Sequence, residues 1–221
     1  TDRPEGRREL TDGFTKRFGV TIKYFTLDDM YDVLRSGDPS EAARLSKQLK
    51  ANALRVVEPS DKEINDAMRF YLGIQALMER EQANAITIDC FAALMANKLA
   101  AYPCISWSKL NDQGKYGVCE ADVNSTLTQM LVTPCTGKPG FVSDPVFDVS
   151  RNEVIHAHCV AATKMQGING PSSPYLIRDH LETAEGATLQ VLMPSDETIT
   201  ALRFVGSDRM LLSAARVTGH I

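Results

Sequence analysis

The feature that most constrains the fold is a change of sequence pattern at residues 136–140, Thr-Gly-Lys-Pro-Gly. Before it, helix-start signals alternate with short apolar runs, a rhythm typical of an α/β layered domain. After it, short alternating runs between turn residues favour a β-meander or barrel. We therefore predict an α/β layered domain over residues 1–140 and a β-rich, barrel-like domain over residues 141–221.

Helices are predicted from their capping signals. Thr26 with Asp29, and Ser60 with Glu63, have the spacing of capping boxes, and Pro39 suits a first helical position. A further helix is expected over residues 120–132, just after a strand. The helix that begins after Ser60 is long and amphipathic, and its apolar stripe contains Ile64, Met68, Tyr71, Leu72 and Met78.

Strands are predicted where apolar residues alternate with polar ones or form short buried runs. A hairpin is expected at Pro-Ser-Asp-Glu, residues 194–197, and a loop is expected at the Gly-, Ser- and Pro-rich residues 164–174. The predicted strands are residues 19–25, 85–90, 104–108, 154–161, 187–193, 198–205 and 210–217.

Charge and hydropathy exclude several classes of function. The net charge is −4 and no block of Lys and Arg stands out, so nucleic acid is not an expected partner. The longest apolar runs are too short to cross a bilayer, so no membrane association is expected. The first residues are polar and charged, which argues against a signal peptide. The absence of an initiator Met indicates a cut or processed start.

The five cysteines, at positions 90, 104, 119, 135 and 159, contain no CxxC pair. This spacing argues against a zinc knuckle, and the odd count argues against a disulfide framework. A reducing cytoplasmic location is therefore expected.

Five acidic and histidine residues could carry chemistry: Glu120, Asp122, Asp144, His156 and His158. Taken singly, each has an ordinary structural role. The first two stand at a helix start, where carboxylates cap the helix, and that role is favoured for Asp122. Asp144 precedes a proline, as turn residues do. The two histidines, two apart in a strand, face one side. Together these residues offer oxygen and nitrogen ligands suited to Mn²⁺ or a similar divalent ion.

An ordered series of motifs resembles the core of the L-fucose isomerase/L-arabinose isomerase superfamily. The resemblance spans residue 18 to the C-terminus and is densest between Cys90 and Cys159. It identifies the chain as the middle and C-terminal part of a fucose isomerase-like protein. The resemblance implies that residues 1–140 are the C-terminal part of a Rossmann-like α/β layered domain, the second domain of the isomerase, and that residues 141–221 are a truncated, β-barrel-like C-terminal domain. The motifs are Pro-Cys-Ile-Ser (103–106), Leu-Asn-Asp-Gln-Gly (110–114), Cys-Glu-Ala-Asp-Val (119–123), residues 127–131, Thr-Gly-Lys-Pro (136–139), Ser-Asp-Pro (143–145) and Ala-His-Cys (157–159).

The resemblance implies a metal site. In that family the Glu of an E-x-D motif and a downstream Asp bind the catalytic metal, which corresponds to Glu120 and Asp144 here, 144 − 120 = 24 residues apart. His158 comes next, in the position of a third ligand. The implied cofactor is a divalent metal. Mn²⁺ is the expected ion, and Co²⁺ and Mg²⁺ are alternatives that oxygen and nitrogen ligands suit almost as well.

Two departures from the family pattern concern completeness. The family has its own N-terminal α/β domain, and this sequence begins near the middle of the second domain. The family also places a metal-ligating His close to its C-terminus, whereas this sequence stops at Gly219-His220-Ile221. The sequence is therefore expected to be a fragment of a larger enzyme, with an incomplete site.

The reaction implied is interconversion of an aldose and a ketose through a cis-enediol, with Glu120 and Asp144 as both metal ligands and acid/base groups. Trp107, Asn111 and His180 are candidate sugar-binding residues. A core anchor is an equal alternative for Trp107, and a structural role is favoured for His180. Cys119 is expected to be a packed small residue.

Two other functions stay open on the sequence alone. A lyase or transferase could use the same scaffold, and a truncated module could bind sugar without catalysis. The expected partner is a small sugar substrate. Family relatives are trimers or hexamers, so the resemblance also implies a homo-oligomer.

Overall fold

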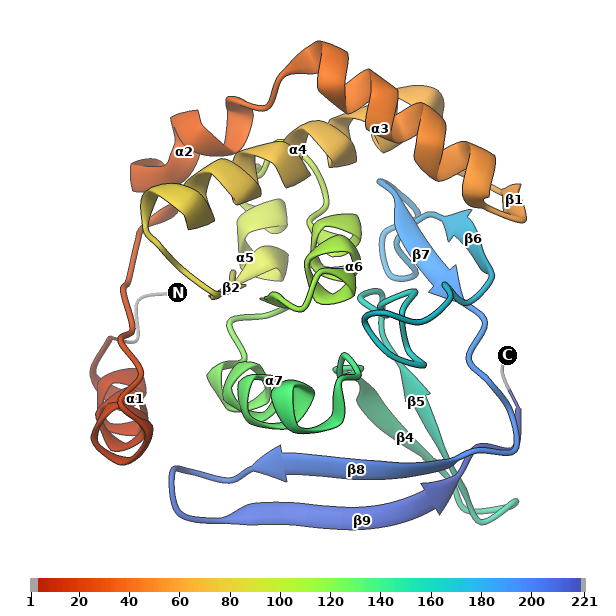
Figure 1. Cartoon of the computed structure of the whole chain (residues 1–221). Coiled ribbons are helices and arrows are strands. Elements are labelled where there is room, and N and C mark those ends of the chain that lie inside the picture. Colours follow the sequence, from red (N-terminus) through yellow and green to blue (C-terminus); the bar gives the residue numbers. More distant parts are fainter. Residues whose placement is uncertain (1–3, 220–221) are drawn as a thin grey trace.

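The computed structural model describes residues 4–219 and shows a mixed α/β protein with seven helices and nine strands in that range (Figure 1). The helices are α1 (Pro4–Phe18), α2 (Leu27–Arg35), α3 (Pro39–Asn52), α4 (Asp61–Arg80), α5 (Cys90–Met95), α6 (Cys104–Asp112) and α7 (Val123–Thr136). The strands are β1 (Arg55–Val56), β2 (Ala85–Thr87), β3 (Tyr116–Val118), β4 (Asp144–Asp148), β5 (Glu153–Ala157), β6 (Tyr175–Arg178), β7 (Thr188–Val191), β8 (Thr198–Phe204) and β9 (Met210–Arg216).

Helix α4 is the central element of the packing. Helices α2 and α3 pack along it, and α6 lies against its inner side (Figure 1). Its C-terminal half contributes Phe70, Tyr71, Ile74, Leu77 and Met78 to one apolar core, shared with α2 and α6. Its N-terminal half contributes to a second core, shared with α3, β6 and β7. Each large apolar side chain buried in this way contributes about 1.5–3 kcal/mol.

The strands form several small sheets. The largest has the order β1-β6-β7, with β1 parallel and β7 antiparallel to β6. Strands β2 and β3 pair in parallel in the middle of the molecule. Strands β4 and β5 form one antiparallel hairpin, and β8 and β9 form another, which lies under α7 in Figure 1.

The predicted helices are confirmed. Both capping boxes are formed, since the Thr26 and Ser60 side chains accept from the N–H of Asp29 and Glu63, whose carboxylates accept in return. Pro39 opens α3. The helix expected over 120–132 is α7, which begins three residues later because the chain turns first. The loop expected at 164–174 contains no helix or strand.

Two predicted strands are wrong. Residues 104–108 belong to α6, a helix that is buried on almost every side. A short, continuously buried run does not distinguish a helix from a strand. Residues 19–25 form no strand, because no strand among residues 4–219 pairs with them. Side chains hold this segment instead: Lys23 Nζ donates to Glu81 Oε2 at 3.0 Å, and Tyr24 Oη donates to Thr11 Oγ1 at 2.7 Å.

The remaining strand predictions hold in part. Strand β2 ends at Thr87, and Cys90 already begins α5. Strand β5 ends at Ala157, earlier than expected. Strands β7, β8 and β9 lie within the expected ranges, but the hairpin predicted at 194–197 is wrong: β7 pairs with β6, and β8 pairs with β9. An apolar run in the sequence does not specify which strand it pairs with. Here the pairing of β7 with β6 is set by the burial of both strands against α3 and α4.

The coarse fold class is therefore a mixed α/β arrangement. Within residues 4–219 the strands do not close into a barrel, since each sheet has two or three strands. The domain boundary at residue 140 stays a prediction. The sheet β1-β6-β7 and the second core contain residues from both sides of it. No helix in the described part of the chain has the length and apolar composition needed to cross a bilayer.

Gly73 tests the packing of α4. A Cβ atom there would lie 2.7 Å from the carbonyl oxygens of both Val33 and Leu34, so α2 can approach only a glycine. We expect Gly73→Val to lower the free energy of unfolding by at least about 2 kcal/mol, because α2 must move away with its buried Met30 and Leu34. Urea denaturation checks this.

Gly219→Val is the matched control, since a Cβ atom there meets no atom within 4 Å. It should change stability by less than about 0.5 kcal/mol. Equal stability of the two variants would contradict the close approach of α2 and α4.

Candidate metal centre

Glu120, Asp144 and His158 lie together, and one donor atom from each lies within 4.8 Å of the other two. His158 Nε2 is 3.7 Å from Asp144 Oδ2 and 3.9 Å from Glu120 Oε1. The His158 side chain is only 7% exposed, whereas those of Glu120 and Asp144 are 55% and 75% exposed. The cluster thus has a buried imidazole at its base and two carboxylates open to solvent.

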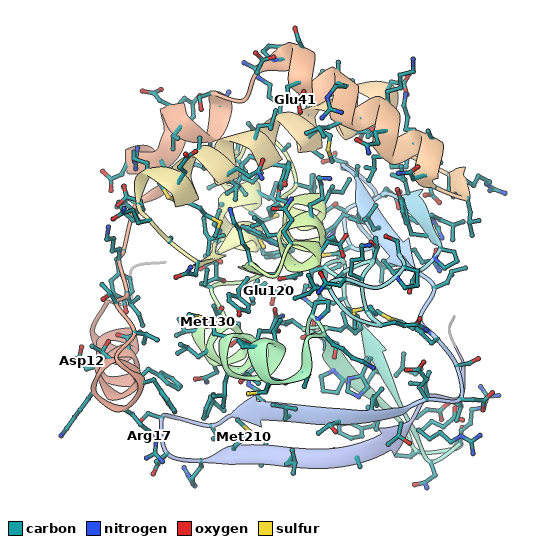
Figure 2. The ribbon with its side chains drawn as sticks, viewed as in Figure 1. Asp12, Arg17, Glu41, Glu120, Met130 and Met210 are labelled. Atoms are coloured by element: carbon teal, nitrogen blue, oxygen red, sulfur yellow. The ribbon has the colours of Figure 1, made fainter. Side chains whose placement is uncertain are left out.

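Glu120 is held in place by an unusual turn between β3 and α7. Glu120 and Ala121 both have left-handed backbones, with φ of 63° and 53°. Such a backbone costs about 1–2 kcal/mol for each non-glycine residue. The Ala121 N–H donates to the Ile88 carbonyl at 3.0 Å, which ties the turn to the segment after β2. In the view of Figure 2, Glu120 lies between α6 and α7. Strain of this kind is often found at functional sites.

Strand register brings Asp144 and His158 together. In the β4–β5 hairpin, Asp144 is paired with Ala157, so His158 is the next residue after its cross-strand partner. Because β5 ends at Ala157, His158 lies just beyond the paired residues, and its Nε2 comes to 3.7 Å from Asp144 Oδ2. The hairpin therefore provides two of the three donors.

Charge and burial act on the cluster in opposite directions. Burial lowers the pKa of His158, but Cys159 and the carboxylates of Asp144 and Glu120 outweigh it and raise the pKa to about 9. Burial raises the pKa of the Glu120 carboxyl; the His158 charge opposes this, and Asp144 adds to it. The Cys159 N–H lies 2.9 Å from His158 Nδ1, so Nε2 is the ring nitrogen that faces the carboxylates.

The donor set fits a divalent cation. Separations of 3.7 and 3.9 Å are too long for hydrogen bonds between these groups. An ion about 2.1 Å from each donor can bridge atoms up to about 4.2 Å apart. Two carboxylates and one imidazole suit a hard or borderline ion such as Mn²⁺, Mg²⁺ or Zn²⁺. The cluster could thus hold a metal.

Two other predicted candidates have different places. Asp122 is the N-cap of α7: its Oδ1 accepts from the Ser125 N–H at 3.0 Å, as the capping interpretation expects. Its Oδ2 also pairs with Arg203 of β8 at 2.5 Å. His156 is exposed and lies outside the cluster, with its Nδ1 2.8 Å from the Ser143 hydroxyl. The structure therefore brings His158 but not His156 into the donor cluster, and because β5 ends at Ala157 the two residues do not share one regular strand face.

The sugar-binding candidates Trp107 and Asn111 are buried. Trp107 is 0% exposed within the core that α4 shares with α6, which leaves no ring face for a sugar. Asn111 is 1% exposed, and its amide is used within the fold. Its Nδ2 donates to the Gly117 carbonyl at 3.1 Å, and its Oδ1 accepts from the Gly117 N–H at 3.0 Å. Both residues therefore hold α6 against β3.

A second group of donors lies behind the carboxylates. Cys104, Cys159 and His180 each offer one atom within 4.8 Å of the others, and Cys119, His158 and Cys159 form a similar group. Hydrogen bonds from Cys104 and Cys119 lower the pKa of Cys159 well below its usual value. Sequence spacing gave no direct sign of this cluster. Its one signal is that Cys119 precedes Glu120 and Cys159 comes directly after His158.

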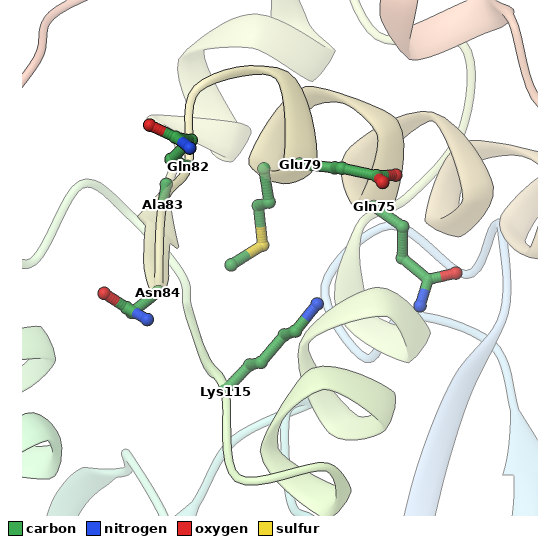
Figure 3. A pocket seen from close by; sticks show the side chains of 7 residues that line it. Gln75, Glu79, Gln82, Ala83, Asn84 and Lys115 are labelled. Carbon is green, nitrogen blue, oxygen red and sulfur yellow. The ribbon is translucent and has the colours of Figure 1, made fainter.

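The surface also carries an open depression of about 610 Å³ at the C-terminal end of α4, lined by Gln75, Glu79, Lys115 and neighbouring residues (Figure 3). It contains none of the donors described above. The chemistry of this protein is therefore better sought at the carboxylate–imidazole cluster than in this depression.

No protein-family model matches the chain. No curated protein matches it either.

Substitution of the two acidic residues of the E-x-D motif, Glu120 and Asp122, should affect different properties of the protein. Asp122→Ala removes a helix cap and the partner of Arg203, so we expect it to lower the free energy of unfolding by about 1–2 kcal/mol. Binding of Mn²⁺ should stay within about twofold, because Asp122 is not in the donor cluster. Glu120→Gln should instead weaken Mn²⁺ binding and leave the free energy of unfolding nearly unchanged. Denaturation curves and metal titrations on both variants check this pair, and a loss of Mn²⁺ binding in Asp122→Ala would contradict the assignment.

Proposed function

We propose that this protein is a metal-dependent sugar isomerase-like protein, in which Glu120, Asp144 and His158 hold a divalent ion, preferably Mn²⁺. The observation that carries the proposal is the meeting of these three donors from separate segments of the chain. The motif resemblance orders the same three residues as ligands. Interconversion of an aldose and a ketose needs both a metal ion and a proton carrier, and these three residues could provide both.

A bound divalent ion would polarise the substrate carbonyl and stabilise negative charge on its oxygen. The protein side chains supply the rest. Glu120 is the preferred proton carrier, because burial raises the pKa of its carboxyl towards the working range of a general base. Asp144, 75% exposed, is open to substrate from the other side of the cluster. His158, buried beneath both, orients the carboxylates.

A metal titration tests the site directly. We expect Mn²⁺ to bind the chain, and His158→Gln to weaken binding at least about tenfold by removing the nitrogen donor. His156→Gln is the matched control on the same hairpin, since His156 lies outside the cluster and should leave the affinity unchanged. Isothermal titration calorimetry measures both. Equal affinities for the two variants would show that the cluster is only an ion-pair network.

The affinity should also depend on pH. The pKa of His158 is raised to about 9 without metal, so below that pH an incoming ion must displace a proton. Between pH 6.5 and 8.5 the association constant for Mn²⁺ should therefore rise, by up to about tenfold per pH unit. Calorimetry in buffers of different ionisation enthalpy counts the proton released. A pH-independent affinity in this range would contradict His158 as a ligand.

Catalysis is tested with a panel of aldoses and added Mn²⁺, followed by NMR detection of the ketose, on the natural polypeptide. Glu120→Gln should lower kcat by about 10²–10⁴-fold with a smaller change in KM, because it removes the proton carrier. Unchanged turnover in this variant would overturn the role of Glu120. Carbon–carbon cleavage products would point to a lyase instead.

A further inference from the structure

We infer that the protein holds a second, buried metal site for a thiophilic ion, Zn²⁺, formed by Cys104, Cys159 and His180 with Cys119 as a fourth ligand. This site goes beyond the proposed function and does not depend on it. It lies behind the carboxylate cluster and draws on side chains that the isomerase proposal leaves unused.

The first three donors come from distant parts of the chain. Cys104 is the first residue of α6, Cys159 lies just after β5 and His180 lies just after β6. Their donor atoms nevertheless lie within 4.8 Å of one another. Ligands about 2.0–2.3 Å from a zinc ion in a tetrahedral site lie within this separation after small shifts. The fold has therefore brought the groups close enough for one ion.

Burial favours a metal over solvent here. Cys104 and Cys119 are 2% and 3% exposed. The sulfur of Cys119 lies within 4.8 Å of that of Cys159 in the neighbouring group with His158, so a small shift would let it complete the set. Three cysteines and one histidine form a common tetrahedral zinc ligand set, and sulfur ligands select Zn²⁺ over Mg²⁺ or Mn²⁺.

The strongest sign is at His180. Its Nδ1 is buried and has no hydrogen-bond partner among the described residues, although the Cys159 sulfur interacts with the ring. Such an unpaired atom costs about 1–3 kcal/mol unless something binds it. The ring also lies against Tyr102, with centroids 5.3 Å apart, and the Tyr102 hydroxyl donates to Thr183 Oγ1 at 2.9 Å. The imidazole is thus held towards the sulfurs.

The local backbone fixes His180 further. Its N–H donates to the Glu185 carbonyl at 2.9 Å, and its carbonyl accepts from the Ala184 N–H at 2.8 Å. Gly186 closes this loop with φ of 71°, and a Cβ atom there would clash with the Tyr102 ring. A ligand on such a constrained loop loses little freedom when an ion binds, which favours tight binding.

The two sites would stand back to back. Glu120 and His158 contribute to the outer site, whereas the adjacent Cys119 and Cys159 contribute to the inner one. The outer site has mostly oxygen donors and the inner one mostly sulfur. The two sites should therefore sort ions by hardness, with Mn²⁺ outside and Zn²⁺ inside.

Cobalt titration of the reduced, chelator-treated protein tests the inner site. We expect one equivalent of Co²⁺ to produce an intense thiolate-to-cobalt charge-transfer absorption in the near ultraviolet, which Zn²⁺ then abolishes. Cys104→Ser, Cys159→Ser and His180→Gln should each weaken binding at least about 100-fold, because even indirect contacts to a metal are worth about 10–100-fold. Cys135→Ser is the matched control, since Cys135 is exposed on α7 and should leave the absorption unchanged.

Glu120→Gln separates this inference from the proposed function. It should weaken Mn²⁺ binding at the outer site and leave the thiolate–cobalt absorption intact. An absorption that survives in Cys104→Ser and Cys159→Ser would overturn the inner site, as would its absence from folded wild-type protein.

Alkylation of the wild-type protein avoids the risk that a buried variant misfolds. With Zn²⁺ present, peptide mass spectrometry should show slower modification of Cys104 and Cys159 by at least about tenfold, while Cys135 reacts equally fast in both samples. Equal modification of all cysteines with and without Zn²⁺ would overturn the inference.

Discussion

The burial of α4 is the interaction on which the rest of the structure depends. Its two halves enter two different apolar cores, one shared with α2 and α6 and the other with α3, β6 and β7. Because the small sheets have two or three strands each, none of them could organise the molecule alone. Helix α4 therefore supplies the common surface against which both halves of the chain are placed.

The candidate site depends on this frame through short connections. Strand β3 packs beside α6, and the left-handed turn at Glu120 and Ala121 comes directly after it. The hairpin of β4 and β5 then brings Asp144 and His158 to the same point. A strained turn and a strand register thus do together what neither does alone, namely place two carboxylates beside one buried imidazole.

Neighbouring residues of the chain supply donors to two different clusters. Glu120 and His158 belong to an oxygen-rich cluster open to solvent, whereas Cys119 and Cys159, one residue away, belong to a buried sulfur cluster. The difference in donor hardness gives the two clusters different preferred ions, so occupation of one does not require the other.

Local sequence determined the helix starts, because a capping box such as Thr26 with Asp29 involves residues only three apart. It also determined that Glu120, Asp144 and His158 are candidate ligands. The partner of β7, the helical state of residues 104–112 and the exclusion of His156 were decided only by tertiary structure. These features depend on burial against distant segments, which a local pattern does not encode. The sulfur cluster belongs to the same class: Cys104, Cys159 and His180 carry no mutual spacing signal, and only the packing of α6 against the segments after β5 and β6 brings them together.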